Sequence, residues 1–248
     1  MSQRIWIIGA SDGIGAALAR LYAQQGHHLV LSARRGGALK KIDKTLVGSG
    51  HQCVPMDVRR PQSIEAAKTE VLSHWSRIDR VIYMAGLYQP MKMQDLDIKQ
   101  TKKIIEVNLL GAFHICHALI PDLLSFSPCQ LAFCASVAGY RGLPGGQPYG
   151  ASKAGLINLV QSLRIECGER IDVRLINPGF VKSRLTDKNE FAMPLRLSAD
   201  DAARRIIKGL EGRSFEIHFP RRFTYIMKGL GILPDLLYHK LMRPRGTT

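Results

Sequence analysis

Short apolar runs rich in β-branched residues alternate along the chain with longer segments whose apolar residues return at helical spacing. A continuous apolar run of this length is typical of a strand that is buried on both faces, as in a parallel sheet. Helical spacing is clearest after the first run, after Pro61 and across residues 98–124. The alternation predicts one α/β domain with a parallel sheet. The predicted strands are residues 4–9, 28–32, 52–56, 78–83, 131–136, 172–177 and 215–219.

A glycine-rich segment, residues 9–15, lies between the first predicted strand and the helix that follows it. Glycines at such a turn let the backbone bend tightly and approach a ligand, while the free N–H groups of the first helical turn face a diphosphate. A glycine cluster alone is more often a plain turn, but this placement favours nucleotide binding. The residues expected at the diphosphate are Gly9, Ser11, Asp12, Gly13, Ile14 and Gly15.

Two arginines, Arg34 and Arg35, follow the second predicted strand, where dinucleotide-binding folds read the ribose. A carboxylate there bonds the 2′-hydroxyl, whereas guanidinium groups accommodate a 2′-phosphate, so the pair predicts NADP(H) in preference to NAD(H). The alternative is a solvated basic loop. Further along, Asp57 and Val58 follow the third predicted strand, where the carboxylate could accept a bond from an adenine amino group.

Tyr149 and Lys153 are four residues apart in a predicted helix that ends near Gly168, so their side chains share one face. An ammonium near a phenol favours the phenolate and could lower the phenol pKa by up to about three units from its usual value of about 10. The pair would then exchange protons near neutral pH. Alone, this spacing is common and is also that of an ordinary surface pair.

Other polar residues fall at predicted strand ends or inside helices. Ser136 ends one strand and Asn177 ends another, on the side where parallel sheets bind ligands. Asn108 lies inside the helix predicted for residues 98–124, where an amide needs hydrogen-bond partners. It is therefore either a structural tie or a functional group.

The motifs taken together resemble a short-chain dehydrogenase/reductase of the single-domain type, from the N-terminus to about residue 185. The resemblance implies a Rossmann-like, doubly wound parallel sheet of about seven strands flanked by helices. It also implies NAD(P)-dependent hydride transfer and a homodimer or homotetramer. The motifs are Gly9-x-x-x-Gly13-x-Gly15, Asp57, Ala85-Gly86, Asn108, Ser136, Tyr149-x-x-x-Lys153 and Pro178-Gly179.

The same resemblance implies roles for individual residues. Tyr149 would be the general acid or base, Lys153 would lower its pKa and hold the nicotinamide ribose, and Ser136 would bond the substrate oxygen. Asn108 would place a water in a proton relay. Further cofactor contacts are implied at Ala85, Gly86, Pro178, Gly179, Val181 and Ser183.

Three positions depart from the pattern of the family. Met84 stands where the family often has an asparagine that ties the central strands together, and Ile8 replaces a frequent threonine. Ser183 replaces another threonine but keeps the hydroxyl, so its contact with the carboxamide is expected to survive.

The composition limits the number of domains and the cellular compartment but does not indicate a reaction. At 248 residues, 46% apolar and 22% charged, the chain has the make-up of one globular domain. Its five cysteines have no paired spacing and indicate buried thiols in a reducing compartment. The first strand begins by Arg4 and no run of about 18 apolar residues occurs, so a soluble, cytoplasmic protein is expected.

The net charge of +15 permits an anionic ligand, nucleic acid or an acidic membrane. No nucleic-acid module is recognisable, so no nucleic-acid partner is predicted. His114, Cys116 and His117 are close together, but no further ligands lie at zinc-like spacing, so no metal is predicted.

The C-terminal residues indicate the kind of substrate and carry no catalytic motif. We predict a catalytic domain over residues 1–219 and a basic amphipathic extension over residues 220–248. In the family, residues 184–197 correspond to a lid over the substrate, and their apolar side chains suggest an apolar substrate or plain core packing. The extension could lie peripherally on an anionic membrane, cover the substrate pocket or pack against a neighbouring subunit.

These observations predict an NADP(H)-dependent oxidoreductase that transfers a hydride between the nicotinamide and a carbonyl or secondary alcohol. Tyr149 would be the general acid or base, and the small-molecule substrate would be apolar. The alternative is a catalytically quiet protein that senses NADP(H) or serves as a scaffold with the same fold.

Overall fold

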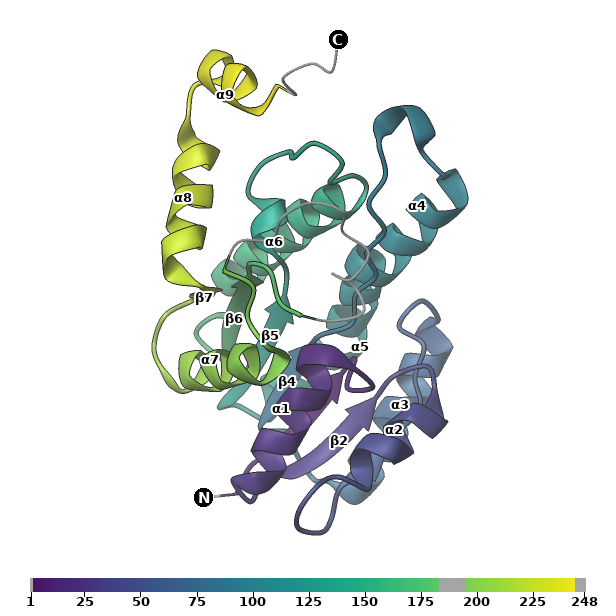
Figure 1. The fold of residues 1–248 in the computed structure, drawn as a ribbon. Coiled ribbons are helices and arrows are strands. Elements are labelled where there is room, and N and C mark those ends of the chain that lie inside the picture. The colour runs from purple at the N-terminus through teal and green to yellow at the C-terminus, as the bar shows by residue number, and fades with distance from the viewer. Residues whose placement is uncertain (1, 183–194, 244–248) are drawn as a thin grey trace.

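The computed structural model describes residues 2–182 and 195–243. Within these residues, seven parallel strands form one sheet in the order β3-β2-β1-β4-β5-β6-β7 (Figure 1). This arrangement confirms the predicted α/β fold and the number of strands. The strands are β1 (Arg4–Ile8), β2 (His28–Ser32), β3 (Gln52–Cys53), β4 (Arg80–Tyr83), β5 (Cys129–Cys134), β6 (Ile171–Pro178) and β7 (Glu216–Phe219).

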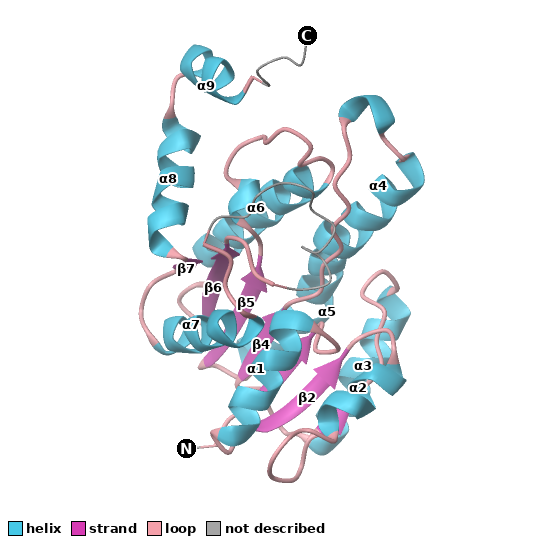
Figure 2. Ribbon diagram, in the orientation of Figure 1, coloured by secondary structure: helices cyan, strands magenta, loops and turns pink. Residues whose placement is uncertain are grey.

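Helices connect the strands and cover both faces of the sheet (Figure 2). The described residues form α1 (Gly13–Gln24), α2 (Gly36–Asp43), α3 (Pro61–His74), α4 (Ile98–Ile105), α5 (Gly111–Ser125), α6 (Tyr149–Cys167), α7 (Ala199–Glu211), α8 (Arg221–Ile232) and α9 (Asp235–Met242). Single 3₁₀ turns lie at Met93–Asp95 and Val137–Gly139.

Two apolar layers form the core, one on each face of the sheet. In β1, Trp6 and Ile8 point to one layer and Ile5 and Ile7 point to the other, because successive side chains of a strand alternate. The first layer packs the sheet against α3, α5 and α6, and the second packs it against α1, α2 and α7. Burial on both faces explains why the strands read as continuous apolar runs.

The helix α2 was not predicted from the sequence. Its segment begins with two glycines, which disfavour helix, and buries only Leu39 among its own residues. The strand β3 is shorter than the predicted residues 52–56. Backbone pairing with the β2 side nevertheless continues past its end, since Val54 N bonds Leu31 O at 3.0 Å and Met56 N bonds Ala33 O at 3.1 Å.

The predicted helix over residues 98–124 is present, with a π-helical segment, Glu106–Leu110, between α4 and α5. The combined helix, Ile98–Ser125, is long and apolar enough to cross a membrane, but half of its most apolar window is buried inside the protein. A buried core helix of this kind is weak evidence for a membrane span. π-helical segments often occur at functional sites, and this one contains Asn108.

The centre of the sheet dominates the stability of the fold. Ile82 in β4 is fully buried, so Ile82→Ala removes apolar contacts and leaves a cavity. We expect a loss of about 2–5 kcal/mol in the free energy of unfolding, measured by urea denaturation followed by circular dichroism. The matched change Ile98→Ala, at a side chain that is 57% exposed, should cost less than about 1 kcal/mol. Equal losses in the two variants would contradict this view of the core.

Candidate active site

A cavity of about 1040 Å³ opens at the carboxyl ends of β1, β4, β5 and β6. In an open parallel sheet this is where ligands bind, beside the point at which the strand order reverses between β1 and β4. Most of the residues predicted from the sequence lie in its wall. They are Gly9, Ser11, Asp12, Gly13, Ile14, Gly15, Arg34, Arg35, Val58, Ala85, Gly86, Ser136, Tyr149, Lys153, Pro178, Gly179 and Val181.

The glycine loop forms a backbone cradle in which Gly9 and Gly15 leave no space for a Cβ atom. Gly9 has φ +99°, and a Cβ atom there would lie 2.6 Å from the backbone nitrogen of Ala85. A Cβ atom on Gly15 would lie 2.2 Å from the carbonyl oxygen of Gly9. The Asp12 side chain accepts a hydrogen bond from Gly13 N at 2.8 Å, at the start of α1. The loop therefore brings bare backbone and a helix N-terminus to the cavity, and this geometry fits a diphosphate.

The two predicted ribose-binding arginines lie at the edge of this cradle. Arg34 and Arg35 are exposed, line the cavity and form no ion pair with any described residue. Asp57 is not in the cavity wall. Its carboxylate pairs with Arg59, with Oδ2 2.6 Å from Nη2, and the hydrogen bond from Arg59 holds the pKa of Asp57 below its usual range. Arg59 therefore competes for the carboxylate that we expected at the adenine.

Asn108 is a structural tie and does not line the cavity. Its Oδ1 accepts a hydrogen bond from Leu87 N at 2.7 Å, and its Nδ2 donates to Leu87 O at 2.9 Å and to Ser152 Oγ at 3.0 Å. It thus fastens the loop after β4 to α6. A Cβ atom on Gly86 would lie 3.7 Å from both Asn108 Oδ1 and Lys153 Nζ, so the tie ends next to the buried ammonium.

Tyr149 and Ser136 meet at the carboxyl end of β5. The Ser136 side chain lies near enough to the Tyr149 hydroxyl to act on the pKa of the phenol, and its oxygen accepts a hydrogen bond from Ala138 N at 3.2 Å. The Tyr149 ring lies edge-on to the ring of Tyr88, with centroids 4.9 Å apart. A phenol and a serine hydroxyl therefore point together into the cavity, as required of a pair that binds one substrate oxygen.

The expected lowering of the Tyr149 pKa is wrong. Burial raises the pKa of the Tyr149 phenol well above its ordinary value, and the hydrogen bond to Ser136 opposes this only in part. The sequence spacing brings the Lys153 ammonium to 5.6 Å from the ring centroid, but Nζ donates at 2.7 Å to the carbonyl of Cys134. Proximity on one helix face did not determine where the ammonium points.

Lys153 is a buried cation. The residue is only 3% exposed, and no carboxylate of the described residues pairs with it. Burial consequently lowers the pKa of Lys153. A charge held in this way is unfavourable for folding and is typical of a functional site.

Several residues of the cavity wall were missed by sequence reasoning. Tyr88 and Met91 come from the loop after β4, and Phe223, Met227 and Met242 come from α8 and α9. No local pattern marks a single apolar residue as cavity-lining, but the amphipathic extension was a general indication. Ser183 and most of the expected lid, residues 184–197, lie outside the described residues.

Among residues 2–182 and 195–243, no three metal-ligating side chains lie close enough to hold an ion. His114 Nδ1 lies 2.9 Å from the carbonyl oxygen of Val58, and burial raises the pKa of the Cys116 thiol to about 12. Both are explained by packing within the core.

The family model for short chain dehydrogenases matches residues 3–193. The chain belongs to this family. It is 30% identical over 247 residues to an uncharacterized oxidoreductase of Myxococcus xanthus, covering 98% of each chain. Among solved structures, a short chain dehydrogenase from Burkholderia cenocepacia in complex with NADP has a TM-score of 0.85 at 22% identity and 98% coverage of each chain. One from Burkholderia phymatum in complex with NAD has a TM-score of 0.84 at 22% identity, covering 92% of each chain. The short-chain dehydrogenase is thus an oxidoreductase whose structural neighbours bind NAD or NADP.

Lys153→Met tests whether the buried charge is costly. Because burial lowers the pKa of Lys153 below its usual 10.5, the unfolded chain binds the extra proton between the two values. Wild-type stability should therefore rise with pH through this window relative to the variant, by about 1.4 kcal/mol per unit of pKa lowering. The measurement is urea unfolding of both proteins from about pH 7 upward.

The hydrogen bond from Lys153 to the Cys134 carbonyl contributes to the folded-state pKa, so the slope reports the net cost of the charged form. Lys208→Met, at an exposed position of α7, is the control and should show no such slope. A stability difference for Lys153→Met that does not change with pH would refute the interpretation.

Proposed function

We propose that this short-chain dehydrogenase is an NADP(H)-dependent oxidoreductase that interconverts a carbonyl group and a secondary alcohol on an apolar substrate. The observation that carries the proposal is the meeting of the Tyr149 and Ser136 hydroxyls at the cavity, beside the buried Lys153. A protein that only sensed the cofactor would not require this set of groups.

The residues present fit a dinucleotide. The loop around Gly9 and Gly15 admits close approach only because both residues lack Cβ, and α1 begins there. The bound cofactor would supply or accept the hydride. Arg34 and Arg35 support a 2′-phosphate, since two exposed guanidinium groups reach the cavity with no competing ion pair in the described chain.

The roles of the other residues follow from their contacts. A carbonyl oxygen placed between Ser136 and Tyr149 would accept hydrogen bonds from both, which stabilises the negative charge that develops during reduction. Tyr149 would then give its proton to that oxygen. The raised pKa of Tyr149 keeps the phenol protonated, which suits this role as acid. The Lys153 ammonium would stabilise the resulting phenolate and hold ribose hydroxyl groups.

We propose a positioning role for Asn108 instead of the water-binding role expected from the sequence. Both hydrogens of its amide are already donated, to Leu87 O and to Ser152 Oγ. We propose that Asn108 positions the segment of Gly86 and Leu87 against Lys153, so that the buried ammonium keeps its place.

The wall of the cavity supports an apolar substrate. Its outer part is formed by Met91, Leu143, Phe223, Met227 and Met242. A site lined in this way favours ligands that bury apolar surface, with the few polar groups setting orientation. We further propose a homo-oligomer, supported by the exposed apolar side chains of Leu110 in the π-helical segment, Phe113 in α5 and Ile165 in α6. The cytoplasmic location stays a prediction.

Tyr149→Phe removes the phenolic hydroxyl and leaves the ring. We expect kcat/KM for NADPH-dependent carbonyl reduction to fall by about 10²- to 10⁴-fold, because acid catalysis is lost. NADPH binding, measured by fluorescence titration, should change little. Tyr225→Phe, at a 59% exposed ring on α8, is the matched control and should retain full activity.

A panel of ketones and aldehydes graded by chain length and ring size supplies the substrates. Retention of activity by Tyr149→Phe would contradict the assigned role. Tight NADPH binding without turnover of any compound would instead favour the sensing protein.

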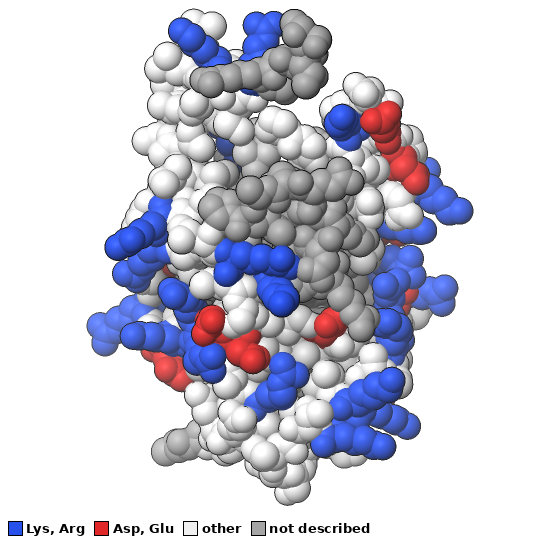
Figure 3. Space-filling view, viewed as in Figure 1, with Lys and Arg blue, Asp and Glu red and all other residues white. Residues whose placement is uncertain are grey.

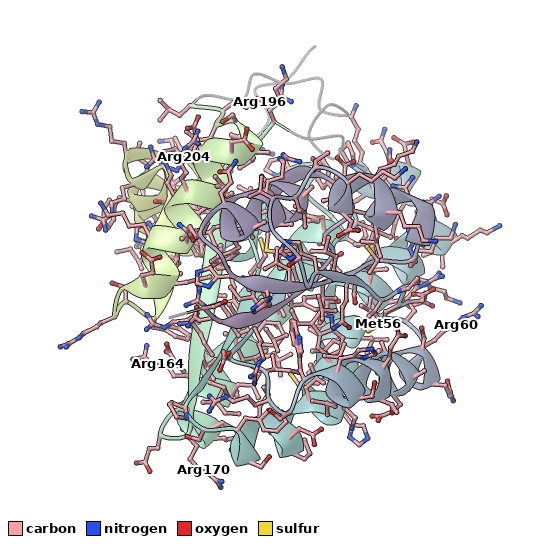
Figure 4. All side chains as sticks on the ribbon, turned by 90° about the horizontal axis from the view of Figure 1, so that it is seen from below. Met56, Arg60, Arg164, Arg170, Arg196 and Arg204 are labelled. Atoms are coloured by element: carbon pink, nitrogen blue, oxygen red, sulfur yellow. The ribbon has the colours of Figure 1, made fainter. Side chains whose placement is uncertain are left out.

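The cofactor preference is tested at the two arginines. Charge-assisted hydrogen bonds to phosphate contribute about 1.5–3 kcal/mol each, so Arg34→Ala/Arg35→Ala should weaken NADPH binding at least about tenfold. NADH binding should change by less than about threefold because NADH lacks the 2′-phosphate. Arg60→Ala is the control, because Arg60 points away from the protein and does not line the cavity (Figure 4). Met56, four residues earlier, is buried in the cavity wall. Equal losses for both cofactors would contradict the preference.

A further inference from the structure

The two C-terminal helices α8 and α9, residues 221–243, form an arm that extends past the carboxyl ends of the strands (Figure 1). One side of the arm faces the protein. Met227 and Tyr238 are buried, and Phe223, Met227 and Met242 form part of the cavity wall. The arm is therefore a fixed part of the active-site wall.

The other side of the arm is apolar and exposed. Of the thirteen large apolar side chains that are exposed in the described chain, six lie in this arm. In α9 the outward positions 236, 237, 240 and 241 fall on one face, opposite Tyr238 and Met242. The exposed apolar residues are Tyr225, Ile226, Ile232, Leu236, Leu237 and Leu241.

The charge of the arm is positive and largely uncompensated. Lys228 pairs with Glu216 at 2.6 Å, and Asp235, the single acidic residue between positions 221 and 243, pairs with Arg141. Arg221, Arg222, Lys240 and Arg243 have no ion-pair partner among the described residues. Basic side chains are visible over α9 at the top of the space-filling view (Figure 3).

A groove beside this surface adjoins the active-site cavity. A second cavity, of about 700 Å³, lies between the loop at residues 142–144 and α9. It shares Leu143, Pro144 and Met242 with the main cavity and ends at Lys240 and Arg243. The groove therefore lies between the main cavity and the basic end of the arm.

We propose that the arm is a docking element for an anionic lipid bilayer. The exposed leucines and isoleucines would enter the boundary between headgroups and acyl chains, while Lys240 and Arg243 would meet the acidic headgroups. Exposed apolar residues interleaved with cations are the features that such surfaces recognise. The groove would then admit a lipophilic carbonyl compound directly from the bilayer, an inference that rests on the proposed function.

Co-sedimentation with vesicles tests the docking without substrate or cofactor. We expect the wild-type protein to bind phosphatidylcholine vesicles that contain phosphatidylglycerol and not to bind phosphatidylcholine alone. Lys240→Glu/Arg243→Glu should lower the partition coefficient by at least about tenfold, and Leu237→Asp/Leu241→Asp should do the same.

Matched controls separate the arm from overall charge and hydrophobicity. Lys40→Glu/Lys41→Glu makes the same charge change on α2, and Val47→Asp changes another exposed apolar residue, so each should change the partition by less than about twofold. Circular dichroism melting verifies that each variant is folded. If Leu237→Asp/Leu241→Asp unfolds, Lys240→Glu/Arg243→Glu still tests the proposal, because it changes only exposed residues.

Absence of wild-type binding to acidic vesicles overturns the proposal, as does equal loss of binding in the arm and control variants. Light scattering identifies a rival occupant: a smaller molecular mass for Leu237→Asp/Leu241→Asp, with no vesicle binding by wild type, would make the arm an interface between copies of this chain.

Uptake of substrate is tested separately. A long-chain ketone dissolved in acidic vesicles should be reduced at least about fivefold more slowly by Lys240→Glu/Arg243→Glu than by wild type, and a short, water-soluble ketone equally fast by both. Equal rates on the vesicle-bound ketone would overturn uptake from the bilayer. Vesicle binding without turnover of any ketone would defeat the proposed function and leave the docking intact.

Discussion

A buried ammonium group, with no carboxylate partner among residues 2–182 and 195–243, is the constraint on which the site depends. Lys153 lies buried in α6 and gives one hydrogen bond to the Cys134 carbonyl at the end of β5. Desolvation of such a charge is costly, and a hydrophobic residue would be better tolerated for stability alone. The surrounding structure must therefore hold Lys153 in place against its own preference for water. The strand end, the Tyr149 ring and the tie through Asn108 together do so.

The fold follows largely from residues whose effect is local. Continuous apolar runs predicted the strands because both faces of the sheet are covered, and the glycine loop was identifiable because it stands between a strand and a helix. The sequence was less informative where the outcome depends on distant partners. Leu39, with the partly buried Ile42, packs α2 against the core, and the preference of Asp57 for Arg59 is a matter of side-chain geometry.

In the site too, local features were predictable from the sequence, whereas contacts with distant residues were not. Spacing along α6 correctly placed Tyr149 and Lys153 on the cavity, but it could not tell that Nζ would point at the Cys134 carbonyl. The pKa of Tyr149 is consequently governed by burial instead of by the nearby cation. Bound cofactor would change this balance, since ribose hydroxyl groups compete with the carbonyl for the ammonium. Proton transfer and cofactor binding would then be linked through a single side chain.

The loop between Ser136 and Tyr149 links the chemistry to the arm. Three successive residues of this loop contact the C-terminal segment or its anchor: Tyr140 donates to Glu216, which also binds Lys228 of α8, and Arg141 donates to Leu233 O and Asp235. The Gly142 carbonyl accepts a hydrogen bond from Tyr238 of α9.

The Arg141 guanidinium also stacks on the Tyr238 ring, 3.9 Å from its centroid. These contacts join the arm to the segment between Ser136 and Tyr149, the two residues proposed to bind the substrate oxygen. The arm is therefore more than a cover for the cavity. A surface or molecule that bound its outer face would lie two contacts away from the groups proposed to hold the substrate oxygen.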